Sequence, residues 1–234
     1  MNIKNYLSDL NDQTQVIFHK SVEYHDELGK AHHFASCIYE FAQNISDKDE
    51  REMLTTVSSQ IETATLNVSL GMYRQAFSSL RLAFEMALAV VHFSVHKLEL
   101  QEWLDGRADI KWAALIHEDN GILSDRFAKA FFTEFSQDVG AYRSKARNIY
   151  RNLSEYVHGN NETWSGSGLE LKFNEGLLIS YFKSINIVED IIVFVLSCRY
   201  LKTFSAESLE SLEFIPENMN HISYIREYFG GPSN

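Results

Sequence analysis

The 234-residue chain contains no proline before Pro216, and its only other proline is Pro232. Proline lacks a backbone hydrogen-bond donor and breaks helices, so the first 215 positions lack the strongest helix breaker. Leucine, alanine, glutamate and phenylalanine are frequent in the same region, which strengthens the preference for helix. We therefore predict an all-α fold.

The charge and the cysteines narrow the class of protein. The formal net charge of −11 argues against a surface for duplex DNA, since phosphates are neutralised by dense lysine and arginine; any nucleic-acid contact must be local. Cys37 and Cys198 lack the spacing of metal-ligand pairs, which predicts two buried thiols of a cytosolic protein.

The N-terminus does not resemble a signal peptide, and the most apolar window, 177–198, is interrupted by charged side chains. We expect a cytoplasmic protein with no membrane contact.

Apolar residues recur at helical spacing along most of the chain, and turn signals divide the pattern. Asp47, with Glu50 three residues later, predicts the start of a helix, and Gly71 predicts its end. The chain is expected to comprise an N-terminal segment (1–20), one helical domain (21–204), and a short helix and tail (205–234). Residues 160–176 have loop composition and predict a flexible excursion or a small hairpin. The predicted helices cover residues 21–45, 47–70, 73–96, 124–135, 139–158 and 177–204.

The predicted helix over residues 73–96 is apolar on most sides and should lie at the centre of the fold. Its polar residues Arg81, Glu85, His92 and His96 share one stripe. We expect Arg81 to pair with Glu85, and the histidines to bond to neighbouring helices or to a second subunit. The alternative is a metal site on His92 and His96 with Glu85 further back, for which the sequence identifies no third ligand with certainty. We therefore predict no metal and no cofactor.

The stretch 141–159 is the one place where this acidic chain becomes locally basic, and it reads AYRSKARNIYRNLSEYVHG. On a helix, at about 100° per residue, its apolar residues form one face and most of its charged residues fall in an arc roughly 80° wide beside that face. Within the arc Arg151 and His158 are nearly superimposed, two turns apart, whereas Asn152 points elsewhere. Gly159 should end the helix. The arc contains Arg143, Arg147, Arg151, Ser154 and His158.

A histidine and an arginine on one face of a helix are sufficient to cleave RNA without a metal. A histidine near the last carbonyls of a helix, with an ordinary pKa of roughly 6.5, can give or take a proton, and a guanidinium can hold a phosphate and stabilise its growing charge. The ribose 2′-OH would attack the neighbouring phosphate, His158 would relay the proton, and Arg151 would stabilise the phosphorane. The structural alternative is that Arg151 pairs with Glu155 and that His158 only stabilises the helix end.

Arg151-Asn152, followed by His158 with six residues between arginine and histidine, resembles the signature of the HEPN superfamily. In that signature an arginine, usually followed by a polar residue, precedes a histidine by several positions. Residues 73–93 also look like the long helix of HEPN-like bacterial proteins, so the resemblance covers about residues 21–204. It implies a HEPN-like up-and-down helical bundle with extra helices. It also implies a metal-independent endoribonuclease that acts as a homodimer, with two motifs facing each other across a composite cleft.

Carried over to this chain, the resemblance implies that Arg151 and His158 are catalytic and that Asn152 is the supporting polar residue. We add Arg143 and Arg147 as RNA contacts from the helical geometry. The resemblance further implies a toxin or effector of bacterial anti-phage defence (abortive infection), with RNA as substrate and a neighbouring gene product as a candidate partner. One alternative is a non-catalytic HEPN-like scaffold or regulatory module of a defence or toxin–antitoxin complex. Another is a metal-binding helical protein centred on His92 and His96.

Overall fold

The computed structural model describes residues 2–158 and 171–232, except for the side chain of His158. Within these residues all regular secondary structure is helical, which confirms the predicted all-α class. The elements in chain order are α1 (Ile3–Ser21), η1 (Val22–Tyr24), α2 (His25–Gln43), α3 (Lys48–Ser69), α4 (Tyr73–Phe93), α5 (Lys97–Leu104), α6 (Trp112–Leu115), α7 (Asp125–Phe131), η2 (Thr133–Gln137), α8 (Val139–His158), α10 (Glu175–Tyr200), η3 (Leu201–Thr203), α11 (Ala206–Glu210), α12 (Phe214–Asn218) and α13 (Ser223–Tyr228).

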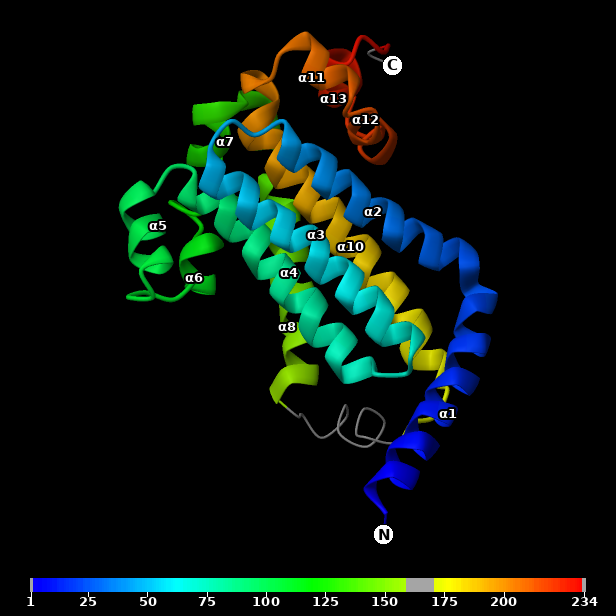
Figure 1. Ribbon diagram of the computed structural model, residues 1–234. Coiled ribbons are helices and arrows are strands. Elements are labelled where there is room, and N and C mark those ends of the chain that lie inside the picture. Colours follow the sequence, from blue (N-terminus) through cyan, green and yellow to red (C-terminus); the bar gives the residue numbers. More distant parts are fainter. Residues whose placement is uncertain (1, 159–170, 233–234) are drawn as a thin grey trace.

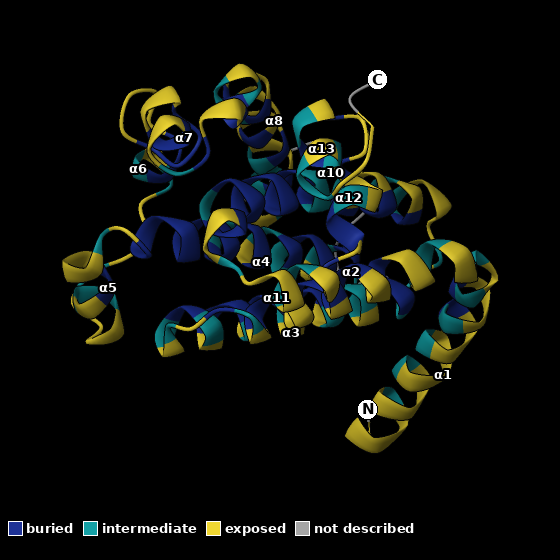
Figure 2. Ribbon diagram, turned by 90° about the horizontal axis from the view of Figure 1, so that it is seen from above, coloured by how far each residue is buried: buried dark blue, intermediate teal, exposed yellow. Residues whose placement is uncertain are grey.

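Helices α2, α3, α4 and α10 run side by side as a bundle, and α8 packs against α4 and α10 (Figure 1). Helix α4 is at the centre, because it also contacts α3, α5 and α6. Figure 2 shows the resulting burial, with α4 and α10 largely buried and α1 mostly exposed. By length and composition α4 could cross a membrane, but 67% of its apolar window is buried inside the protein. That burial is typical of a core helix, as the sequence predicts for residues 73–96.

The turns around α3 follow the sequence signals. The Asp47 side chain accepts a hydrogen bond from the backbone N–H of Glu50 at 3.1 Å, which confirms the predicted N-cap. Two residues after the end of α3, Gly71 adopts a φ of +77°, in the left-handed region that glycine occupies without steric cost. This turn reverses the chain from α3 into α4 and lets the two helices pack along each other.

Gly71→Ala is expected to lower the free energy of unfolding by roughly 2–3 kcal/mol, because it adds backbone strain and overpacking together. A β-carbon at this position would lie 2.8 Å from Cδ1 of Ile17, on α1. Urea denaturation measures the loss. The matched control is Gly106→Ala, where φ is +69° but nothing lies within 4 Å of the added carbon. An equal loss in both variants would contradict the role given to the Ile17 contact.

Several predicted boundaries differ from the structure. The N-terminal segment 1–20 is itself mostly helix, although Ile17 and Ser21 are the only buried residues of α1. The predicted helix over 124–135 ends at Phe131, because Phe132 is extended at φ −152° and a 3-10 turn follows. Residues 171–174 form neither helix nor strand and α10 begins at Glu175, two residues earlier than predicted. The rest of the predicted loop or hairpin, residues 160–170, and the predicted helix end at Gly159 lie outside the described residues.

The C-terminal segment docks on the chain itself. The Tyr224 hydroxyl donates to Asp138 and the Tyr228 hydroxyl to the Leu201 carbonyl, each at 3.0 Å. In Figure 1, α11, α12 and α13 gather at one end of the bundle. The aromatic side chains of the tail therefore pack against residues of the same chain.

The two cysteines are buried free thiols, as predicted. Burial raises the pKa of both Cys37 and Cys198 to about 12. Neither thiol is ionised near neutral pH, so both act as small apolar core residues.

Candidate functional site

Helix α8 is held against α4 and α10 by stacked aromatic rings. Tyr142 stacks on Phe194 of α10 with ring centroids 3.7 Å apart, and Tyr156 stacks on Phe77 of α4 at 3.8 Å. Val157, predicted on the apolar face, is 40% exposed and lines an open hollow at the end of the bundle instead. The remainder of the predicted face is buried or half-buried, and consists of Val139, Tyr142, Ala146, Ile149, Tyr150 and Leu153.

Tyr150 joins α8 to the polar stripe of α4. Its hydroxyl donates to the Glu85 carboxylate at 2.7 Å and accepts from the Arg81 guanidinium at 2.6 Å. Arg81 also contacts Glu85 at 3.3 Å, which confirms the predicted pair. The ring of Tyr150 stacks on Trp112 of α6 at 3.7 Å. Glu85 therefore belongs to a packing network between α4, α6 and α8, and the alternative that joins it to a histidine metal site is wrong.

Arg143, the first arginine of the predicted arc, is bound within the protein. Its guanidinium contacts the Glu118 carboxylate at 3.0 Å and the Leu123 carbonyl at 3.1 Å. The side chain is only 15% exposed. These contacts hold the segment between α6 and α7 against α8, so the guanidinium has few donors left for a phosphate.

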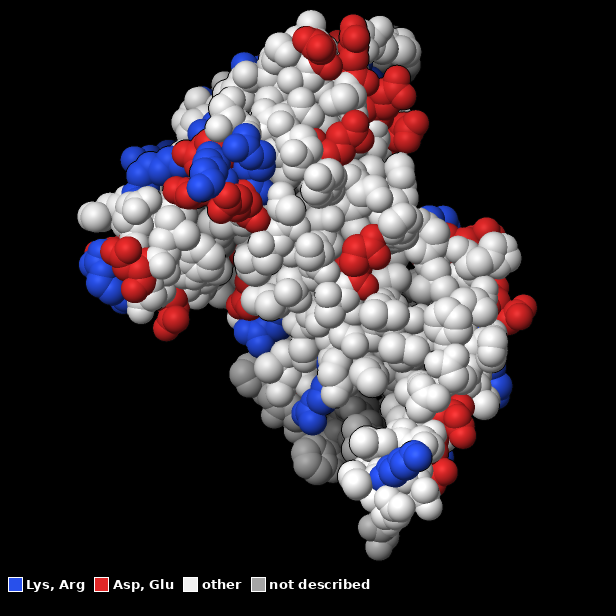
Figure 3. Space-filling model, in the orientation of Figure 1, with Lys and Arg blue, Asp and Glu red and all other residues white. Residues whose placement is uncertain are grey.

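Arg147 and Arg151 differ from Arg143, because both side chains are exposed. Neither makes a hydrogen bond or ion pair with another residue in the described part of the chain, and the predicted Arg151–Glu155 pair is not among the contacts found there. A guanidinium in this state keeps its donors available for an external anion. In Figure 3, basic atoms show at the lower ends of α4 and α8, a larger group of basic atoms mixed with acidic ones lies at the upper left, and acidic atoms gather over α11 and α12.

Asn152 lies on a different side of α8 from the arginines, as the helical geometry predicts. It lines a groove of about 390 Å³ between α8 and α10, together with Lys145 and Asn148. Across this groove Lys145 pairs with Asp190 of α10 at 2.8 Å. Asn152 is exposed there and is separated from Arg151 by about 100° of helical rotation. The structure thus does not bring Asn152 and Arg151 together.

The guanidinium of Arg74, from α4, contacts the end of α8, and the sequence patterns do not predict this contact. Nε of Arg74, at the start of α4, donates to the backbone carbonyl of Tyr156 at 2.7 Å. This carbonyl belongs to the last turn of α8, where carbonyls lack helical partners and attract positive charge. Helix α8 ends at His158, two turns after Arg151, although the structure does not describe the histidine side chain. The exposed Arg151 and the end of the helix therefore lie on one element, roughly 10 Å apart along its axis.

The second group of candidate residues lies at the opposite end of α4. The Nε2 atom of His92 is 3.0 Å from one carboxylate oxygen of Glu99, and Nδ1 of His96 is 3.7 Å from the other. The two imidazole rings stack with centroids 4.2 Å apart. Burial lowers the pKa of His92 below its ordinary value, and the hydrogen bond to Glu99 acts in the opposite direction.

Sequence patterns miss three side chains of these sites. Arg74 and Glu118 act over separations of 82 and 25 residues, for which no local signal exists. Glu99 is different, since it follows His92 by seven residues and His96 by three. That spacing is visible in the sequence once the helix is allowed to end between the histidines.

Comparisons of the chain with family models, with curated proteins and with solved structures give no match.

Proposed function

We propose that the protein is a metal-independent endoribonuclease of the HEPN type. The observation that carries the proposal is the state of Arg151: it is exposed, has no partner among the described residues, and lies two turns before His158 on one helix. The guanidinium donors of an exposed arginine can bind an external phosphate. Those of a structural arginine such as Arg143 are occupied by other residues of the protein. The all-helical bundle is also what the HEPN-like motif implies.

The proposed reaction is an internal phosphoryl transfer. The ribose 2′-oxygen attacks the adjacent phosphorus, the bond from phosphorus to the 5′-oxygen of the next nucleotide breaks, and the products are a 2′,3′-cyclic phosphate and a 5′-hydroxyl. His158 removes the proton from the 2′-hydroxyl and returns a proton to the leaving oxygen. Arg151 binds the non-bridging oxygens and stabilises the charge that develops on them. Arg147, one turn before Arg151, binds a neighbouring phosphate of the RNA.

The site is proposed to be completed by a second copy of the chain. One protomer contributes one arginine and one histidine, and a homodimer that brings two α8 ends together would place two of each around one phosphodiester. We propose that such a dimer works in the cytoplasm as a toxin or as an effector of anti-phage defence, with a neighbouring gene product as its regulator. Cleavage of cellular RNA would then arrest growth.

A second function is favoured by the exposed face of α1. Ile3 and Leu7, one turn apart on the same side of this helix, are 66% and 56% exposed, and only two residues of the helix are buried. Exposed apolar residues on one helix are typical of a surface that binds another protein. This supports the alternative of a non-catalytic HEPN-like scaffold or regulatory module in a defence or toxin–antitoxin complex.

Induced expression in bacteria separates the two functions. The ribonuclease proposal predicts growth arrest and fragmented cellular RNA on induction of the wild type, and normal growth with His158→Ala at equal protein level. The control is Leu7→Ser, which alters the exposed face of α1 and should leave toxicity unchanged. Growth arrest that persists with intact RNA in His158→Ala and is lost in Leu7→Ser would contradict the ribonuclease and support the interaction module.

A further inference from the structure

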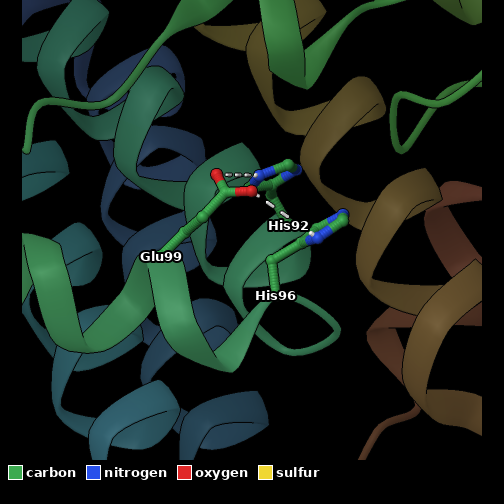
Figure 4. A group of neighbouring side chains, drawn as sticks. All are labelled: His92, His96 and Glu99. Atoms are coloured by element: carbon green, nitrogen blue, oxygen red, sulfur yellow. Dashed lines mark hydrogen bonds and ion pairs between the residues drawn. The ribbon is translucent and has the colours of Figure 1, made fainter.

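The cluster of His92, His96 and Glu99 is formed where α4 ends and α5 begins. Helix α4 ends at Phe93, the chain turns through Ser94 to His96, and α5 begins at Lys97 and contacts α4. Figure 4 shows the Glu99 carboxylate pointing between the two imidazole rings, with an interaction to each of them. One imidazole from α4, one from the turn and one carboxylate from α5 thus converge on one point.

The spacing of these groups is close to that of a metal site. One ligand atom from each side chain can be chosen so that all three lie within 4.8 Å of one another. In a tetrahedral zinc site, with ligands at about 2.0–2.1 Å from the ion, neighbouring ligand atoms are roughly 3.3 Å apart. The separations of 3.0 Å between His92 Nε2 and Glu99 and of 3.7 Å between His96 Nδ1 and Glu99 lie on either side of this value, and the exposed side chains of His96 and Glu99 can rotate.

One side chain of the cluster, His92, is buried, whereas His96 and Glu99 are open to solvent. The His92 side chain is 7% exposed, and its Nδ1 is buried with no hydrogen-bond partner in the described part of the chain. His92 and Glu99 line a cavity of about 260 Å³. His96 and Glu99, at 41% and 52% exposure, leave the site accessible from solvent. An ion can therefore enter, and water can occupy a fourth position.

We infer that His92, His96 and Glu99 form a binding site for one Zn²⁺ ion. Imidazole nitrogens favour zinc and its transition-metal neighbours over Mg²⁺ and Ca²⁺, which prefer all-oxygen sites. Three protein ligands leave one position for water or an exchangeable ligand. The bound ion would add to the contacts that hold α5 to the end of α4, which include a hydrogen bond, a longer ion pair and the ring contact between Phe93 and Trp103.

The zinc site is separate from the proposed RNA site. Arg74, which contacts the end of α8, and His92 are 18 residues apart on α4, which corresponds to about 27 Å along the helix axis. The ion is therefore far from the end of α8 at His158, and zinc binding does not depend on the protein being a ribonuclease.

Titration of tag-free, chelator-treated protein with ZnCl₂ in a calorimeter tests the inference. We expect one ion per chain, a dissociation constant in the micromolar range or tighter, and a rise in melting temperature, since a ligand that binds only the folded state stabilises it. MgCl₂ should give no binding. His96→Ala and Glu99→Gln should each weaken zinc binding at least tenfold, and both change exposed side chains, so the fold is retained and is checked by far-UV circular dichroism.

The matched control is His32→Ala, which removes an exposed histidine that also pairs with a glutamate, Glu62, on neighbouring helices. It should bind zinc as tightly as the wild type. Absence of saturable binding at one ion per chain would overturn the inference. Wild-type affinity in both His96→Ala and Glu99→Gln, or an equal loss of affinity in His32→Ala, would overturn it as well.

Discussion

Arg151→Ala is expected to lower the rate of RNA cleavage by a factor of roughly 10²–10³, the usual loss when one donor to a developing oxyanion is removed. The melting temperature should not change, because the Arg151 side chain is exposed and has no partner among the described residues. Single-turnover cleavage of a labelled RNA measures the rate, and a thermal melt of the same preparation measures the stability. Arg151→Lys should restore only part of the rate, since an ammonium cannot bind a phosphate through two parallel hydrogen bonds.

Two other arginines serve as controls for Arg151. Arg147→Ala should weaken RNA binding by a few-fold with little effect on the cleavage step, as expected for a contact to a flanking phosphate. Arg107→Ala removes an exposed arginine that pairs with Asp105 in the turn after α5, and should cleave RNA as the wild type does. If Arg151→Ala cleaves RNA at the wild-type rate, Arg151 is not a catalytic residue and the proposed reaction is wrong.

Glu189→Gln is expected to raise the free energy of unfolding at pH 8 by roughly 3 kcal/mol, the free-energy equivalent of the raised pKa that the substitution removes. Burial raises the pKa of Glu189, on α10, to about 7, and the neighbouring charge of Asp190 adds to the effect. Above pH 7 the folded protein therefore carries a half-buried carboxylate at a cost in stability. Glutamine removes the charge and can still accept the hydrogen bond that Asn218 donates to Glu189 at 3.0 Å.

The sign of the pH dependence follows from the protons bound in each state. Between about pH 4.5 and pH 7 the folded protein keeps the Glu189 proton whereas the unfolded chain releases it, so the free energy of unfolding falls as pH rises through this window. The advantage of Glu189→Gln should therefore be absent at pH 4 and complete at pH 8. Urea denaturation of both proteins at a series of pH values measures it.

Asp190→Asn is the matched control, because the adjacent carboxylate has the partners that Glu189 lacks. Asp190 accepts from the Tyr142 hydroxyl and from Nζ of Lys145, each at 2.8 Å. Its neutralisation should lower the stability at pH 8, opposite in sign to Glu189→Gln. A stability gain of equal size in the two variants would contradict the assignment of the effect to the burial of Glu189.

The parts of the fold that the sequence predicts best are those governed by local rules. The N-cap at Asp47 and the left-handed turn at Gly71 depend on neighbouring residues alone, and the structure confirms both. The end of the helix at Phe131 is missed, since the extended backbone of Phe132 follows from packing against distant aromatic rings such as Tyr228, 5.3 Å away between centroids. The helical nature of α1 is missed although its apolar residues recur with helical periodicity, as those of α2 and α3 do.

In the candidate site, too, the sequence predicts what local geometry determines and misses what tertiary contacts determine. Helical geometry correctly separates Asn152 from the arginine arc, because the rotation per residue is a local property. It cannot distinguish Arg143 from Arg151, which share that arc, since the difference lies in Glu118 and Leu123, two residues that only the tertiary fold brings to Arg143. For the same reason the stripe on α4 suggests Glu85 as a partner of the histidines, whereas the chain reversal after Phe93 brings Glu99 instead.

The most direct test of the central claim is a cleavage time course with purified, tag-free protein and a structured RNA in excess EDTA, for wild type and His158→Ala. The account predicts that the wild type cuts the RNA with the chelator present, that the fragments end in 2′,3′-cyclic phosphates, and that His158→Ala leaves the RNA intact. RNA that stays intact with the wild type, cleavage that stops in EDTA, or equal cleavage by His158→Ala would contradict it.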